Sequence, residues 1–173
     1  SASGYLFGAI AGNLENNSGN KLLLFIDSKT GGYNNLSSWT FRDQSPYYSI
    51  ANLDGNITFD PDFAPDYILG INQANANEVY YDLYNMQDNT CTHQTNSGST
   101  FLGFTGNTGF GDYTKGFEFA IPTSALAPSS SSIKVFAMIV NDPGSSDATF
   151  ISNQFLTRAN FGEGSYGKAN GTP

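Results

Sequence analysis

The stretch Lys21-Leu22-Leu23-Leu24-Phe25-Ile26-Asp27 decides the fold of this chain. Successive side chains of a strand point to opposite faces, so a strand that is apolar at every central position must be covered on both faces. Residues 133–140, which read Ile-Lys-Val-Phe-Ala-Met-Ile-Val, have nearly the same pattern. A single sheet with one face in water explains neither segment. We therefore expect both segments to be central strands of a layered structure.

Short apolar segments separated by turn-forming residues recur along the whole chain. Tyr, Phe, Ile and Val supply most of the apolar positions, and these residues suit a pleated surface. Residues 116–121 alternate and place Phe117, Phe119 and Ile121 on one face. The next residues, 122–126, begin with proline and predict one helical turn. Strands are expected near residues 4–12, 21–27, 46–52, 56–60, 66–72, 78–86, 99–105, 116–121, 133–141 and 148–157.

These patterns predict an all-β fold, a two-sheet antiparallel β-sandwich of the jelly-roll or carbohydrate-binding-module type with one short helical turn. The chain has 173 residues, of which 39% are hydrophobic, and this is enough for one sizeable core. The four-serine connector at residues 129–132 is too short to be a domain linker. We therefore expect residues 1–173 to form a single domain.

The surface is expected to be polar but mostly neutral. The formal net charge is −8, yet only 13% of the residues are charged, while Asn, Gly and Ser contribute nineteen residues each. Seven Lys and Arg residues cannot neutralise a polyanion, which argues against a nucleic-acid or nucleotide ligand. No apolar run is long enough to cross a bilayer. Low charge, abundant Asn and a single cysteine favour a secreted protein, extracellular or on the cell surface.

A resemblance to a known family rests on the order of several short motifs. The chain resembles the family 9 carbohydrate-binding-module and DOMON-like β-sandwiches, in particular those of secreted surface proteins of Bacteroidota-like bacteria. The resemblance implies a two-sheet antiparallel sandwich and extracellular residence, and the family includes sugar-binding, haem-binding and structural members. The segments that carry it are Tyr5-Leu6-Phe7-Gly8-Ala9-Ile10, Leu24-Phe25-Ile26-Asp27, Asp66-Tyr67-Ile68-Leu69-Gly70, residues 116–126 and Val135-Phe136-Ala137-Met138-Ile139.

Carbohydrate recognition needs flat aromatic faces with polar groups beside them. Tyr80, Asp82 and Tyr84 share one face of an expected strand, and the two tyrosines lie about 13 Å apart at about 3.3 Å per residue. Trp39 and Tyr47 lie in a loop rich in Asn, Ser and Gly. These five residues form the expected carbohydrate site. In the alternative interpretation, the tyrosines fill the periphery of the core with their hydroxyl groups in water.

Four acidic residues within thirteen positions predict a structural calcium site. Asp54, Asp60, Asp62 and Asp66 supply the carboxylate oxygens that calcium prefers, although the spacing is not that of an EF-hand. The alternative is that these aspartates form ordinary solvated turns, because Asp side chains hydrogen-bond to their own backbone in loops.

Catalysis and haem binding are not expected. The only histidine, His93, has Cys91 as a neighbour but lacks a visible base or further metal ligands. The resemblance to DOMON-like domains implies that a haem site would use Met and His ligands. Met138 is expected in a core strand here, where it could not serve as a ligand. No phosphate-binding loop or nucleophile motif occurs. The expected partners are a polysaccharide or copies of the chain itself.

Self-assembly is the alternative function. Residues 5–11 are apolar and uncharged, so this strand can pair in its own sheet or insert into the open edge of a neighbour. The chain would then be a structural subunit of an extracellular filament or surface array assembled by exchange of the N-terminal strand.

Overall fold

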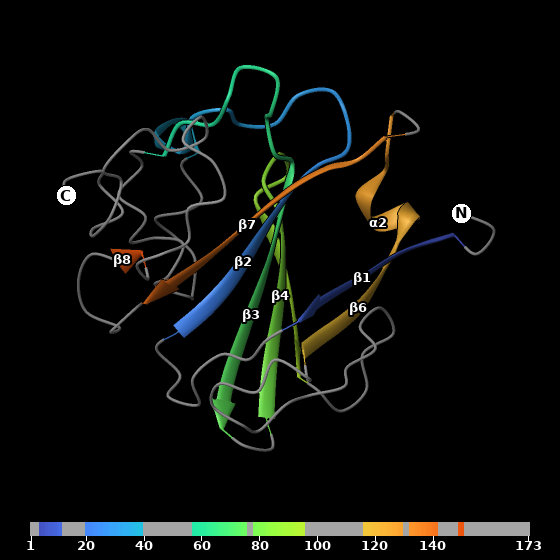
Figure 1. The fold of residues 1–173 in the computed structure, drawn as a ribbon. Coiled ribbons are helices and arrows are strands. Elements are labelled where there is room, and N and C mark those ends of the chain that lie inside the picture. The colour runs from blue at the N-terminus through green and yellow to red at the C-terminus, as the bar shows by residue number, and fades with distance from the viewer. Residues whose placement is uncertain are drawn as a thin grey trace.

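The computed structural model describes residues 4–11, 20–39, 57–75, 78–95, 116–129, 132–141 and 149–150 (Figure 1). Its described strands are β1 (Tyr5–Ala11), β2 (Asn20–Asp27), β3 (Tyr67–Asn75), β4 (Glu78–Asn85), β5 (Thr90–Thr95), β6 (Gly116–Pro122), β7 (Lys134–Asn141) and β8 (Thr149–Phe150). A single turn of α-helix, α2 (Thr123–Leu126), follows β6, and a 3₁₀ turn, η1 (Leu36–Ser38), follows β2. In the described part of the chain, no helix is long and apolar enough to cross a membrane.

The strands form two antiparallel sheets, and the expected all-β sandwich with one short helical turn is confirmed. The larger sheet has the order β5-β4-β3-β2-β7-β8, and the smaller sheet consists of β1 and β6. In Figure 1, the β1–β6 pair lies beside the larger sheet, with α2 at one end. The central position expected for residues 21–27 is confirmed, because β2 pairs with β3 on one side and with β7 on the other.

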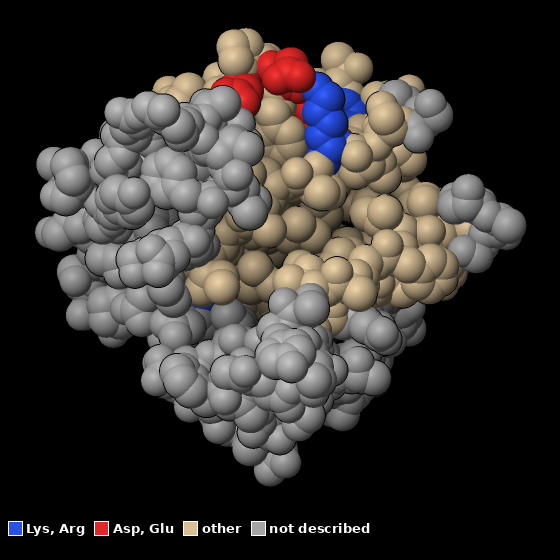
Figure 2. All heavy atoms as spheres, in the orientation of Figure 1, with Lys and Arg blue, Asp and Glu red and all other residues tan. Residues whose placement is uncertain are grey.

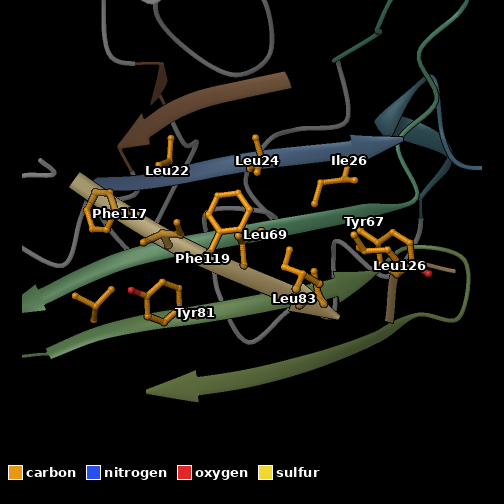
Figure 3. Close-up of a cluster of buried hydrophobic side chains, with 13 residues drawn as sticks. Leu22, Leu24, Ile26, Tyr67, Leu69, Tyr81, Leu83, Phe117, Phe119 and Leu126 are labelled. Atoms are coloured by element: carbon orange, nitrogen blue, oxygen red, sulfur yellow. The ribbon is translucent and has the colours of Figure 1, made fainter. Parts of the chain in front are cut away.

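The first hydrophobic core lies between the two sheets. Figure 3 shows side chains of β6 meeting those of β2, β3 and β4 in this cluster. The expected inward face of residues 116–121 is confirmed, since Phe117, Phe119 and Ile121 are all buried there. The helical turn α2 adds Leu126 at the same place. The buried members are Leu22, Leu24, Ile26, Tyr67, Leu69, Ile71, Val79, Tyr81, Leu83, Phe117, Phe119, Ile121 and Leu126.

A second core covers the opposite face of the larger sheet. Leu23 and Phe25 of β2 point to this side, while η1 supplies Leu36 and the segments after it supply Trp39 and Phe59. Both faces of β2 are therefore buried, which is the physical reason for its continuous apolar sequence. The buried members are Leu23, Phe25, Leu36, Trp39, Ile57, Phe59, Ile68, Tyr84, Met86, Met138 and Val140.

Some expected elements are different in the structure. The segment expected to be a strand near residues 56–60 contributes only an isolated bridge between Asn35 and Thr58. No strand was expected between residues 86 and 99, but the chain turns after β4 and returns as β5. Asn89 enables this turn, since it adopts the positive φ of 55° that asparagine tolerates. Strands expected near residues 46–52 and 99–105, and most of that near 148–157, lie outside the described residues.

Strand β7 meets the expectation of a covered central strand only in its second half. Met138 and Val140 are buried, whereas Val135 is 56% exposed. The neighbouring strand β8 pairs only with Val140 and Asn141. Among the described residues, the first half of β7 thus has a strand on one side only.

Candidate functional site

Two aromatic residues of the expected carbohydrate site lie inside the second core. Trp39 and Tyr84 are both 0% exposed, and their rings meet edge to face with centroids 6.3 Å apart. The Trp39 indole Nε1 donates a hydrogen bond to Asn89 Oδ1 over 3.1 Å. A sugar stacks on an open ring face, and neither ring presents one to solvent. The expectation that these two rings form a surface platform is therefore wrong.

The other residues of the expected carbohydrate site differ in how deeply they are buried. Asp82 is buried at 4% exposure, and Tyr80 is half-buried on the same face of β4. Across the sheet, Asp82 lies opposite Gly70 of β3 and His93 of β5. Tyr47 lies outside the described residues. The structure thus brings Tyr80, Asp82 and Tyr84 to one face, but that face is largely buried.

The expected calcium ligands do not converge in the part of the chain that the structure describes. No group of three or more His, Cys, Asp or Glu side chains there is arranged to hold a metal ion. Asp62 is exposed and forms an ion pair with Lys134 at 3.1 Å, which holds the pKa of Asp62 below its usual value. Asp60 begins a turn in which its backbone carbonyl accepts a hydrogen bond from the Phe63 N–H. Because Asp54 is outside the described residues, calcium binding stays a prediction.

Asp66 has a structural role instead. Its Oδ2 accepts hydrogen bonds from the backbone N–H groups of Ser28 and Lys29, both at 2.9 Å, and its Oδ1 accepts from Gln87 Nε2 at 2.8 Å. Burial raises the pKa of Asp66, and the two backbone donors oppose this rise. The carboxylate therefore ties the loop after β2 and the β4–β5 turn to the start of β3, and its oxygens already have protein donors.

Cys91 is an unreactive thiol in this environment. Burial raises its pKa to about 12, the negative charge of Asp82 adds to the rise, and a side-chain hydrogen bond with Tyr84 opposes it. Since only the thiolate is nucleophilic, we expect iodoacetamide at pH 9 to alkylate Cys91 at least ~100-fold more slowly in the folded than in the urea-unfolded protein. Mass spectrometry of timed samples measures both rates, and equal rates would contradict this assignment.

The exposed aromatic side chains of the described residues lie elsewhere, on β1. Tyr5 is 36% and Phe7 is 67% exposed, and their ring centroids are 6.0 Å apart. Residues 6, 8 and 10 of the same strand face the other way, toward the core. Alternation within residues 5–11 was the signal that could have located this pair, because it separates one aromatic face from one aliphatic face.

The residues directly opposite these rings are small and uncharged. In the β1–β6 register, Tyr5 lies opposite Pro122, and Phe7 lies opposite Ala120. Ala9 continues the same outward face and lies opposite Glu118. Figure 2 shows that most of the charged side chains visible in this view gather at the upper rim. We call this outer surface of β1 and β6, with Tyr5 and Phe7 at its centre, the aromatic face.

A glycine holds the other side of β1 against the core. A Cβ atom at Gly8 would collide with the ring of Phe119, which lies directly against the β1 backbone. Gly8 therefore allows β1 to approach β6 and its core side chains closely. This close packing fixes the plane from which Tyr5 and Phe7 project.

The fold and this surface define an all-β sandwich with exposed aromatic rings on the outer face of its smaller sheet. Comparisons with protein-family models, curated proteins and solved structures gave no significant match. The resemblance to family 9 carbohydrate-binding modules and DOMON-like domains is therefore still a prediction.

Proposed function

We propose that this chain is a secreted, non-catalytic β-sandwich that binds a neutral polysaccharide on its aromatic face. The observation that carries the proposal is the pair of adjacent, exposed rings of Tyr5 and Phe7, with the uncharged residues Pro122 and Ala120 directly opposite them. Exposed aromatic groups that lie together on a polar protein are typical of binding surfaces. The proposal keeps the ligand class predicted from sequence and moves the site from β4 to β1.

The chemistry of the aromatic face suits a sugar chain. Pyranose rings present C–H groups that pack on aromatic faces, while hydroxyl groups at the margin need donors and acceptors. The phenol of Tyr5 is both a donor and an acceptor, and the hydroxyl of Thr123 at the start of α2 can accept, since it donates to the Gly4 carbonyl. The small side chains of Ala9, Ala120 and Pro122 let an extended ligand lie across the surface without steric obstruction.

The test is affinity electrophoresis against a panel of neutral polysaccharides. If stacking on both rings provides most of the affinity, replacing Tyr5 and Phe7 together with alanine should cost at least about 2 kcal/mol, or about 30-fold in Kd. The matched control is Val135→Ala, which removes an exposed apolar side chain from β7 and should leave retardation unchanged. The site is wrong if the double variant is retarded as strongly as the wild type.

A further inference from the structure

Strand β1 has one edge without a partner strand among the described residues. Its other edge pairs with β6 at seven positions, from Tyr5 opposite Pro122 to Ala11 opposite Gly116. Proteins usually protect such an edge with charged side chains, proline or a bulge. None of these protections occurs within residues Tyr5–Ala11 themselves, and the register with β6 has no bulge, although it includes Glu118 opposite Ala9 and Pro122 opposite Tyr5. The unpaired edge of β1 can therefore accept another strand.

We propose that β1 pairs antiparallel with β1 of a second copy of this chain, with Gly8 on the two-fold axis. This register places Phe7 opposite Ala9 of the other copy and Tyr5 opposite Ala11. The exposed ring of Phe7 then meets the Ala9 methyl group rather than another ring. On the opposite face, Leu6 lies opposite Ile10. The sequence of β1 is thus complementary to itself, large against small on one face and aliphatic against aliphatic on the other, as a two-fold interface requires.

The core side of β1 supports the same partner. Leu6 and Ile10 pack against the first core but are only partly buried, as are Ala137 and Ile139 of β7. Figure 2 shows a hollow in the described surface where Figure 1 draws the space between β7 and β1. Pairing brings Ile10 and Leu6 of the second copy beside these side chains and removes more apolar surface from water, which is favourable.

The dimer joins the two small sheets into one sheet with the order β6-β1-β1-β6. Both aromatic faces then lie on the same side, so the rings of two copies form one continuous surface. Pairing does not require a ligand, and it depends on the strand edge and the alanine positions. Polysaccharide binding depends on the rings, so each proposal can fail without the other.

Disulfide cross-linking tests the register. Directly opposite residues in antiparallel strands have Cα atoms about 4.5–5.5 Å apart, within the range that a disulfide spans. A mixture of Phe7→Cys and Ala9→Cys proteins should form the mixed dimer at least ~10-fold faster than either variant alone forms its own dimer. Fastest cross-linking of Phe7→Cys with itself would overturn the register, and no cross-linking in any sample would overturn the pairing. Cys91 is half-buried, and unmixed wild-type protein measures its background.

Sedimentation velocity over a range of protein concentrations tests the association itself. The wild type should shift from monomer to dimer as concentration rises. Ala9→Glu places two carboxylate groups near the two-fold axis, each in register with Glu118 of its own chain, and should weaken dimerisation at least ~10-fold. Ser124→Glu adds the same charge at an exposed position of α2 and should dimerise as the wild type does. A wild type that stays monomeric, or an Ala9→Glu protein that dimerises equally well, would overturn the proposal.

Discussion

Replacing Trp39 with alanine is expected to lower the free energy of unfolding by about 4 kcal/mol. The indole is fully buried in the second core, packs edge to face on Tyr84 and bonds Asn89 through Nε1. Alanine would leave a cavity on this face of the larger sheet and remove the contact that anchors the β4–β5 turn. Urea unfolding followed by far-ultraviolet circular dichroism measures the loss, because the variant has no other tryptophan to report by fluorescence.

Two further variants distinguish a side chain that stabilises the core from a side chain that binds the polysaccharide. Trp39→Phe keeps an aromatic ring in the core and loses the bond to Asn89, so we expect a loss of about 1 kcal/mol and unchanged polysaccharide retardation. Phe7→Ala truncates an exposed ring and should change stability by less than about 0.5 kcal/mol while it weakens binding. If Trp39→Phe abolished binding in a folded protein, Trp39 would belong to the sugar site after all.

The fold could be predicted to a large extent because its main signals are local. Continuous apolar sequence in β2 indicates a strand with two covered faces, and alternation in β6 indicates one inward face. Pro122 indicates where the helical turn α2 begins. The β5 strand was missed because its sequence, Thr-Cys-Thr-His-Gln-Thr, has few apolar residues. Its place in the sheet comes from the preceding turn and from pairing with β4.

The site could not be predicted in the same way, because exposure depends on distant segments. Alternation correctly places Tyr80, Asp82 and Tyr84 on one face, but it does not say whether that face meets water. Leu36 and Trp39, from the segment around η1, cover Tyr84. Tyr5 and Phe7 show the same alternation, yet they stay exposed. In a sandwich covered on both sides of one sheet, the pattern alone does not separate a buried aromatic face from a binding face.

Asp66→Ala is expected to cost about 3 kcal/mol of stability, the second largest effect among these predictions. The substitution leaves the N–H groups of Ser28 and Lys29 and the amide of Gln87 without their acceptor. The same region also connects the end of β2 to α2, since Ser28 Oγ donates a hydrogen bond to the Leu126 carbonyl. Urea unfolding measures the loss, and the midpoint should fall without a change in slope.

Two more variants, Asp66→Asn and Asp62→Ala, test whether Asp66 stabilises the fold through its hydrogen bonds or through calcium. Asparagine retains one oxygen for the Ser28 and Lys29 donors but turns an N–H₂ group toward the Gln87 amide, so it should lose part of the stability and stay folded. Asp62 is exposed, so its removal should leave the unfolding midpoint unchanged despite the Lys134 contact. Melting curves with calcium and with chelator, run on all three proteins, distinguish the two roles of Asp66. A hydrogen-bonding role predicts the same destabilisation in both solutions, whereas a calcium ligand would lose stability only when calcium is present.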